Sequence, residues 1–388
     1  MHQFLSKFFE LLAARLGLAF LSMTCIFLAP NFFQVQELAL IFSSLGILGF
    51  LFQPLASSLA DQIVIKNKRK LPTKLILGLG FGLSLLAVAL LVNLNSSEEP
   101  ALLLFSYWCF VVFSLIAAFF RLKQKNLIAL AAVTPFMLPL ILVLRIVMPT
   151  QSLTTIFLEV SLIYIFVALL VNYRLKHLIN PLFSDGQAGN TNFEFFKYFL
   201  ICFGGPIFSM LDIIISAYNL SPEEIVFQRL AIAISALLFI GKNASSFILP
   251  GIVAKMNKNE IRKFKLPAIL TGQLCFAIGF ICILIIMVLD IFELESIEII
   301  KKYETSFLII ILANFTLGFL GPFVVIATKK GLENWLIVGF VGLAFAKLLL
   351  MNLFMNNIFE YSLLLLFLNL LFVGFMWFLV IREKEVTQ

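Results

Sequence analysis

The feature that most constrains this chain is a succession of long apolar runs separated by short polar gaps, which are alternately rich and poor in Lys and Arg. Of the 388 residues, 62% are hydrophobic and 45 are Phe, so too few polar residues remain to cover a water-soluble surface. The runs are unbroken and lack the in-out alternation of a lipid-facing β-barrel strand. The sequence therefore predicts an all-α, polytopic membrane protein.

An apolar helix needs about 20 residues to cross the hydrocarbon core, which divides this sequence into about twelve spans. The predicted spans are 8–29, 36–60, 75–94, 101–120, 127–148, 156–173, 198–218, 225–250, 266–290, 303–327, 335–355 and 362–381. Between the sixth and seventh spans, the pairs Asn-Pro, Asp-Gly and Gly-Asn predict an irregular linker. We therefore expect an N-terminal six-helix lobe at 1–172, a cytoplasmic linker at 173–197 and a C-terminal six-helix lobe at 198–388.

Alternate gaps collect the cations, as the positive-inside rule requires of loops that stay in the cytoplasm. Clusters at 66–74, 121–125 and 255–265 lie on one side, whereas the other side receives Lys301 and Lys302. Both termini are therefore predicted to be cytoplasmic. The net charge of +7 suits the anionic headgroups of a lipid bilayer. The basic clusters are short and lie beside spans, so they do not indicate nucleic acid as a partner.

Signatures of catalysis do not accompany this pattern. The sequence has no Walker-type phosphate loop and no metal-ligand cluster, and both His2 and His177 fall at the predicted periphery. The five Cys residues fall inside predicted spans and are interpreted as packing residues. We therefore expect a transporter, not an enzyme, that holds no metal and no cofactor.

Helix breakers lie inside or at the ends of several spans, where Pro removes a backbone donor and bends the helix. The stretch Gly204-Gly205-Pro206 is the strongest candidate for a hinge, because two flexible residues precede the proline. The alternative interpretation is the Pro and Gly content that is ordinary for membrane helices.

Five cations fall within predicted spans, where each costs about 2.5–3.5 kcal/mol unless it finds a partner, a wet cavity or the interface. These cations are Arg15, Arg145, Arg229, Lys242 and Lys347. Arg145 is close enough to the end of its span to reach the outer headgroups. For Arg15 and Arg229 a structural and a functional role remain equally open. Lys242, roughly 16 Å deep, and Lys347, on an apolar helix, favour a cavity, although pairing with a deep acid is the alternative.

The deep acid is Asp212, on a face where Gly205, Ser209, Ser216 and Asn219 recur at helical spacing. Such a small, polar face fits either a cavity or close helix packing. An interior with several cations and one anion favours a negatively charged substrate, such as phosphate or pyrophosphate attached to a hydrophilic group. The predicted substrate-binding residues are Arg15, Asp212, Arg229, Lys242 and Lys347.

The stretch from Asp212 to Pro250 includes the run Asn-Leu-Ser-Pro-Glu-Glu at 219–224 and Phe-Gln-Arg-Leu-Ala at 227–231. It resembles the polysaccharide-transporter branch of the multidrug/oligosaccharidyl-lipid/polysaccharide flippase superfamily. The opening span with Arg15 and the segment Gln-Pro-Leu-Ala-Ser-Ser-Leu-Ala-Asp at 53–61 are also similar in layout. The sequence departs from that branch at 225–227, where Ile-Val-Phe replaces the usual Gly-x-Tyr.

The resemblance implies two six-helix lobes with alternating access, and a cargo of O-antigen or capsule repeat units on undecaprenyl pyrophosphate. Our first hypothesis is therefore a lipid-linked oligosaccharide flippase of the bacterial inner membrane. A polysaccharide polymerase and glycosyltransferases would be its partners. The second hypothesis is an ion-coupled multidrug or small-molecule exporter of the same superfamily, with Asp212 as the coupling acid. A third, a polysaccharide polymerase or ligase, needs a large outer loop, and the longest predicted one, at 291–302, is short.

Overall fold

The computed structural model describes residues 10, 13–14, 17–18, 21–65, 72–95, 99–122, 125–133, 136–179, 189–238, 295–318, 324, 327 and 331–382. Within these segments the regular elements are all helices, and none is a strand. The all-α fold class is therefore confirmed. The predicted span 266–290, much of 8–29 and the second half of 225–250 lie outside the described residues.

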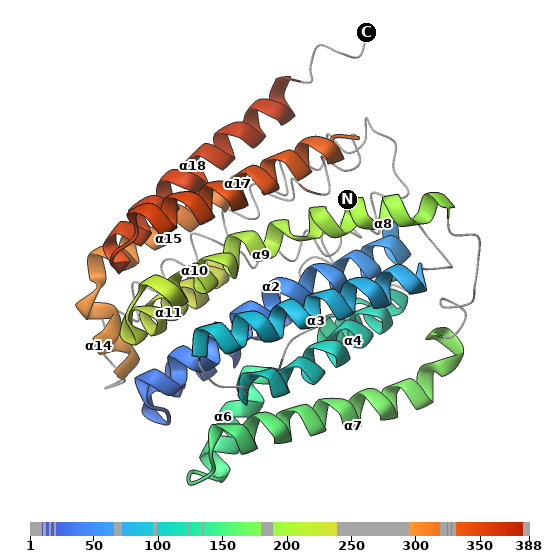
Figure 1. Cartoon of the computed structure of the whole chain (residues 1–388), viewed down its shortest axis with the longest axis horizontal. Coiled ribbons are helices and arrows are strands. Elements are labelled where there is room, and N and C mark those ends of the chain that lie inside the picture. Colours follow the sequence, from blue (N-terminus) through green and yellow to red (C-terminus); the bar gives the residue numbers. More distant parts are fainter. Residues whose placement is uncertain are drawn as a thin grey trace. The chain divides into compact units, whose positions relative to one another are not determined.

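The helices follow the predicted apolar runs closely (Figure 1). In the first half they are η1 (Ala29–Asn31), α2 (Val35–Ile65), α3 (Thr73–Asn95), η2 (Glu99–Leu103), α4 (Leu104–Leu122), α5 (Asn126–Val133), α6 (Met137–Val147) and α7 (Leu153–Ile179). In the second half they are α8 (Gly189–Cys202), α9 (Gly204–Ser209), α10 (Leu211–Asn219), α11 (Pro222–Leu238), α14 (Glu295–Lys302), α15 (Glu304–Gly318), α17 (Glu333–Phe354) and α18 (Ile358–Arg382).

Among the described segments, six helices are long and apolar enough to cross a membrane, or seven if the bent α8–α10 segment is one span. They differ in how much of their surface the protein covers. The apolar window of α2 is 83% buried, whereas those of α7 and α17 are each 28% buried. A helix that exposes a mostly apolar surface needs lipid around it. The chain is thus a multi-pass membrane protein in which α2 is an interior helix.

Two compact units divide the described residues, one within Phe32–Ile214 and the other within Met1–Asn31 and Ile215–Gln388. We call them the N-terminal and C-terminal units. Their boundary falls inside α10, and helix covers residues 173–179 and 189–197 of the predicted linker. The linker is therefore less irregular than expected, because α7 continues until just before the Asn180–Pro181 pair. The division into two six-helix lobes remains a prediction.

In the N-terminal unit, α4 connects its neighbours through polar side chains. Tyr107 donates to the carbonyl of Leu45 in α2 at 3.0 Å, and Trp108 Nε1 donates to Ser84 Oγ in α3 at 3.1 Å. The hydroxyl of Ser106 lies 3.1 Å from that of Ser161 in α7. Because lipid tails compete equally for apolar surface, such hydrogen bonds and close packing hold membrane helices together.

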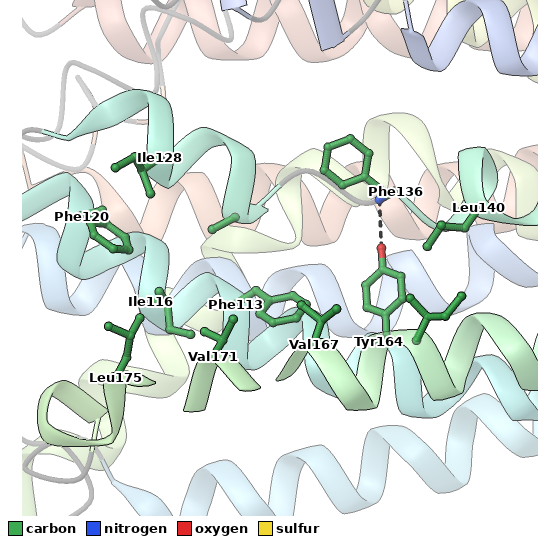
Figure 2. A pocket seen from close by; sticks show the side chains of 12 residues that line it. Phe113, Ile116, Phe120, Ile128, Phe136, Leu140, Tyr164, Val167, Val171 and Leu175 are labelled. Atoms are coloured by element: carbon green, nitrogen blue, oxygen red, sulfur yellow. Dashed lines mark hydrogen bonds between the residues drawn. The ribbon is translucent and has the colours of Figure 1, made fainter. Parts of the chain in front are cut away.

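The predicted span 127–148 is divided into α5 and α6. Pro135 and Pro139 lie at this division, and each removes one backbone donor. The backbone N–H of Phe136, the residue before α6, donates to the hydroxyl of Tyr164 in α7 at 2.9 Å (Figure 2). A side chain of the neighbouring helix thus supplies the hydrogen-bond acceptor for this backbone N–H within the membrane region.

In the C-terminal unit, α15 packs on α18, and α17 lies beside α18 (Figure 1). A capping box begins α11: Glu224 Oε2 accepts from the N–H of Ser221 at 3.0 Å, and Pro222 occupies the first turn. The other oxygen of Glu224 accepts from the N–H of Ile358 at the start of α18. Beside it, Lys302 Nζ lies 2.7 Å from a carboxylate oxygen of Glu223, and this hydrogen bond raises the pKa of Lys302.

Candidate functional site

The structure describes three of the five predicted substrate-binding residues. Arg15 and Lys242 lie outside the described residues. Asp212 lies in α10 within the N-terminal unit, whereas Arg229 in α11 and Lys347 in α17 lie in the C-terminal unit. The convergence of these side chains on one chamber therefore remains a prediction.

Asp212 is the second residue of α10 and is 1% exposed. A bend of 50° separates the segment Phe193–Phe208 from Leu211–Asn219, so Asp212 follows the bend directly. At that position its carboxylate lies beside the positive end of the helix dipole of α10, which lowers the cost of burying an anion. A buried acid at a break in a membrane helix is a functional position by default.

The bend lies one turn beyond the predicted hinge at Gly204-Gly205-Pro206. Pro206 withdraws a donor from the preceding turn, where α8 ends at Cys202 and α9 begins. The larger change of direction occurs at Met210, where the chain packs on two glycines of α2. A Cβ at Gly49 would lie 2.7 Å from Met210 Sδ, and one at Gly46 would lie 3.0 Å from Ile213 Cγ2. These glycines admit the bent segment against α2 and so fix the position of Asp212.

We expect Gly46→Val to destabilise the protein by about 1–3 kcal/mol, because its methyl groups would overlap Ile213 across the α2–α10 contact. The measurement is the thermal unfolding of the purified protein in detergent. Gly82→Val is the matched control, since a Cβ at Gly82 in α3 meets nothing within 4 Å. Equal melting temperatures for the two variants would contradict the role assigned to the α2 glycines.

Two residues of the small, polar face, Ser216 and Asn219, have a packing role. Ser216 Oγ accepts from Gln228 Nε2 in α11 at 2.8 Å, and Asn219 Nδ2 donates to Asn352 Oδ1 in α17 at 3.1 Å. The packing alternative therefore holds for Ser216 and Asn219, which connect α10 with other helices of the C-terminal unit.

Lys347 is fully buried, with 0% exposure, and lies on the face of α17 that packs toward α18. The rings of Phe340 and Phe372 stack 5.7 Å apart, which fixes the register of these consecutive antiparallel helices. Seven residues after Phe340, Lys347 is level with Leu365 and about one turn from Asn369. The cation therefore faces the inside of the bundle, and it does not reach along a lipid-exposed surface toward headgroups.

Buried amides in the same unit were not among the predicted site residues. Gln228 and Asn369 are both 0% exposed, and Asn314 in α15 is 7% exposed. Asn369 Nδ2 donates to the carbonyl of Ala313 at 3.0 Å, while its Oδ1 has no hydrogen-bond partner in the part of the chain that is described. These buried amides could have been predicted from the sequence, because an amide side chain within an apolar run is unusual in a membrane helix. We call Gln228, Asn314, Lys347 and Asn369 the polar interior of the C-terminal unit.

Arg229 is half-buried and follows Gln228 in α11.

Arg145, by contrast, is part of an ion pair in the N-terminal unit. Its Nη2 donates to both carboxylate oxygens of Glu37 at 2.7 Å, and its Nη1 donates to the carbonyl of Gln151 at 2.8 Å. The sequence-based interpretation of Arg145 as a side chain that reaches the headgroups did not include this ion pair with Glu37 in α2.

Comparison with known proteins places this fold. No protein-family model matches the sequence, and no curated protein matches it. Among solved structures, the crystal structure of the eukaryotic MATE transporter AtDTX14 is similar, with a TM-score of 0.61 and 13% sequence identity. The match covers 97% of this chain and 93% of that chain. The chain therefore has the same fold as that transporter.

Proposed function

We propose that this chain is a flippase that moves a lipid-linked oligosaccharide across the bacterial inner membrane by alternating access. The cargo is an O-antigen or capsule repeat unit on undecaprenyl pyrophosphate. The observation that carries the proposal is the complete burial of Lys347 in a membrane-length helix, in a chain with a transporter fold. A cation inside the membrane region is costly and by default marks a functional position.

The polar interior suits such a headgroup chemically. The ammonium of Lys347 supplies positive charge for pyrophosphate, and buried amides such as Gln228 and Asn369 supply donors and acceptors for sugar hydroxyls. Arg229, beside Gln228, adds a second cation in the same unit. The prenyl chain of the cargo stays in lipid, and motion of one lobe against the other opens each side in turn.

The remaining parts of the proposal rest on the charge pattern and on the resemblance to polysaccharide transporters. Both termini and the basic gaps lie in the cytoplasm, where the cargo is made. A polysaccharide polymerase and glycosyltransferases are the expected partners at the two ends of this transport step. Residues Arg15 and Lys242 are proposed to contribute to the same cationic chamber as Arg229 and Lys347.

The test is a translocation assay with the full chain reconstituted into liposomes. The probe is a fluorescent undecaprenyl-pyrophosphate-linked oligosaccharide, quenched from outside by an impermeant reagent. We expect the protein to speed equilibration between leaflets well above protein-free liposomes. A neutral prenyl-linked glycoside of equal chain length is the matched control and should move more slowly. Equal rates for the two lipids, or no translocation by well-folded protein, would overturn the proposal.

An ion-coupled multidrug or small-molecule exporter is the second candidate. The burial of Asp212 at the bend before α10 favours it, because ion coupling requires an acid inside the membrane region. The same liposomes distinguish the two candidates when they carry a proton or sodium gradient and a cationic dye. Gradient-driven dye transport that is lost in Asp212→Asn, without movement of the lipid-linked oligosaccharide, would select the exporter.

A further inference from the structure

An apolar groove lies in the N-terminal unit between α4, α5, α6 and α7, with a volume of about 440 Å³ (Figure 2). Phe136 and Tyr164 lie at one end, and Phe120, Ile128 and Leu175 lie at the other. Tyr164 has the one polar side-chain group among the twelve lining residues, and its hydroxyl already accepts from the N–H of Phe136. The groove therefore offers mainly hydrocarbon contacts.

The mouth of the groove is on a surface that faces lipid. Three lining residues are substantially exposed: Ile128 by 49%, Ile163 by 38% and Val167 by 41%. Around them α7 is one of the least buried of the membrane-length helices. A groove with apolar walls and an apolar rim in this position is open to the hydrocarbon chains of the bilayer.

The length of the groove matches one leaflet. From Tyr164 to Leu175 the helix rises about 16 Å, at about 1.5 Å per residue. One leaflet of the hydrocarbon core is about 15 Å thick. An undecaprenyl chain is several times longer than the groove, whereas a single acyl chain of a glycerophospholipid matches its length.

The end of the groove at Phe120 and Leu175 is bordered by positive charge. Arg121 follows Phe120 at the end of α4, Arg174 precedes Leu175 in α7, and Lys125 precedes α5. Lys125 and Arg174 are both exposed. Cations at the end of an apolar groove suit the phosphate of an anionic lipid headgroup. None of the twelve lining residues is itself charged, so these cations lie beyond the apolar lining of the groove.

We propose that this groove is a binding site for an anionic glycerophospholipid. One acyl chain lies between α4, α5, α6 and α7, and the phosphate lies against Lys125 and Arg174 at the predicted cytoplasmic surface. The proposed glycerophospholipid is a different lipid from the prenyl-linked cargo of the proposed function. In this position the lipid chain supplies packing atoms beside the division between α5 and α6.

The test uses the full chain in nanodiscs of equal amounts of phosphatidylglycerol and phosphatidylcholine. In separate samples, one or the other lipid has a photoreactive group on its acyl chain. We expect crosslinks on peptides of α4, α5 and α7, with phosphatidylglycerol strongly preferred. Lys125→Gln/Arg174→Gln should lower that preference roughly tenfold or more. The control Lys74→Gln/Lys301→Gln removes the same charge elsewhere and should leave the preference unchanged.

A second pair of variants tests the groove itself. Ala132→Trp fills the groove and should remove most of the crosslinks, whereas Leu169→Trp, on the opposite and exposed face of α7, should retain them. Equal labelling by the two phospholipids, or labelling spread evenly over α3, α7 and α17, would overturn the proposal. Competition by undecaprenyl phosphate at equal concentration would also overturn it, because the site would then belong to a prenyl lipid.

Discussion

Lys347→Met is expected to lower translocation of an anionic lipid-linked oligosaccharide by about a hundredfold while the protein remains folded. Met is similar in shape to Lys but has no charge, so it fits a position with 0% exposure and removes the cost of burying an ammonium. The lost factor corresponds to one charge-assisted contact of about 2.7 kcal/mol between the cation and pyrophosphate. The measurement is the initial translocation rate in the liposome assay, with thermal unfolding as the check on folding.

Two comparisons make this prediction specific. Lys347→Arg retains the charge and should retain much more activity than the Met variant. Lys301→Met removes an exposed cation of the same unit and should leave the rate unchanged. A lower melting temperature with unchanged translocation would identify Lys347 as one member of a structural ion pair. A rate that falls equally for the neutral control lipid would also contradict a role in binding the anionic headgroup.

The membrane helices could be predicted closely because a chain in lipid must satisfy its backbone groups within each helix. The predicted spans 36–60 and 335–355 correspond to Val35–Ile65 and Glu333–Phe354. Hydropathy locates these two helices because the bilayer, and not a partner helix, sets their apolar length.

The interruptions of helices were predicted less well because they depend on contacts between distant segments. The bend before α10 lies where Met210 packs on Gly49, and the division of α5 from α6 depends on the hydroxyl of Tyr164. A proline in the sequence shows that a donor is missing, but the neighbouring helix determines where the chain changes direction. The predicted hinge at Gly204-Gly205-Pro206 therefore lies one turn before the bend, and its role as a hinge stays a prediction.

In the candidate site, too, burial could be predicted from a single helix, whereas contacts between helices could not. Burial of Lys347 was predictable from its apolar helix, which gives the side chain no polar face on which to lie. The amide of Asn369 could also be recognised within its apolar run. Its hydrogen bond to the carbonyl of Ala313 could not, because that bond depends on how α18 packs against α15. The pairing of Arg145 with Glu37 could not be predicted from the sequence, because the two residues are 108 positions apart.

That ion pair gives the largest expected effect on stability. The side chains of Arg145 and Glu37 are 14% and 25% exposed, and the Arg145 guanidinium also donates to Gln151 and lies 4.9 Å from the ring centre of Phe33. Arg145→Met would leave the carboxylate of Glu37 with much of its interaction lost in a partly buried position. We expect a loss of about 3–5 kcal/mol in the free energy of unfolding.

A double-mutant cycle separates the pair from the other contacts of each residue. Glu37→Gln alone should also be strongly destabilising, and Arg145→Met/Glu37→Gln should cost less than the sum of the two single changes by about 1–3 kcal/mol. The measurement is equilibrium unfolding in detergent. Lys302→Met is the control, because Lys302 also pairs at 2.7 Å, with Glu223, but its side chain is 55% exposed. Solvent already screens that pair, so its removal should change stability little. Additive single changes, or an equal loss in the Lys302 control, would show that Arg145 acts through packing and not through its charge.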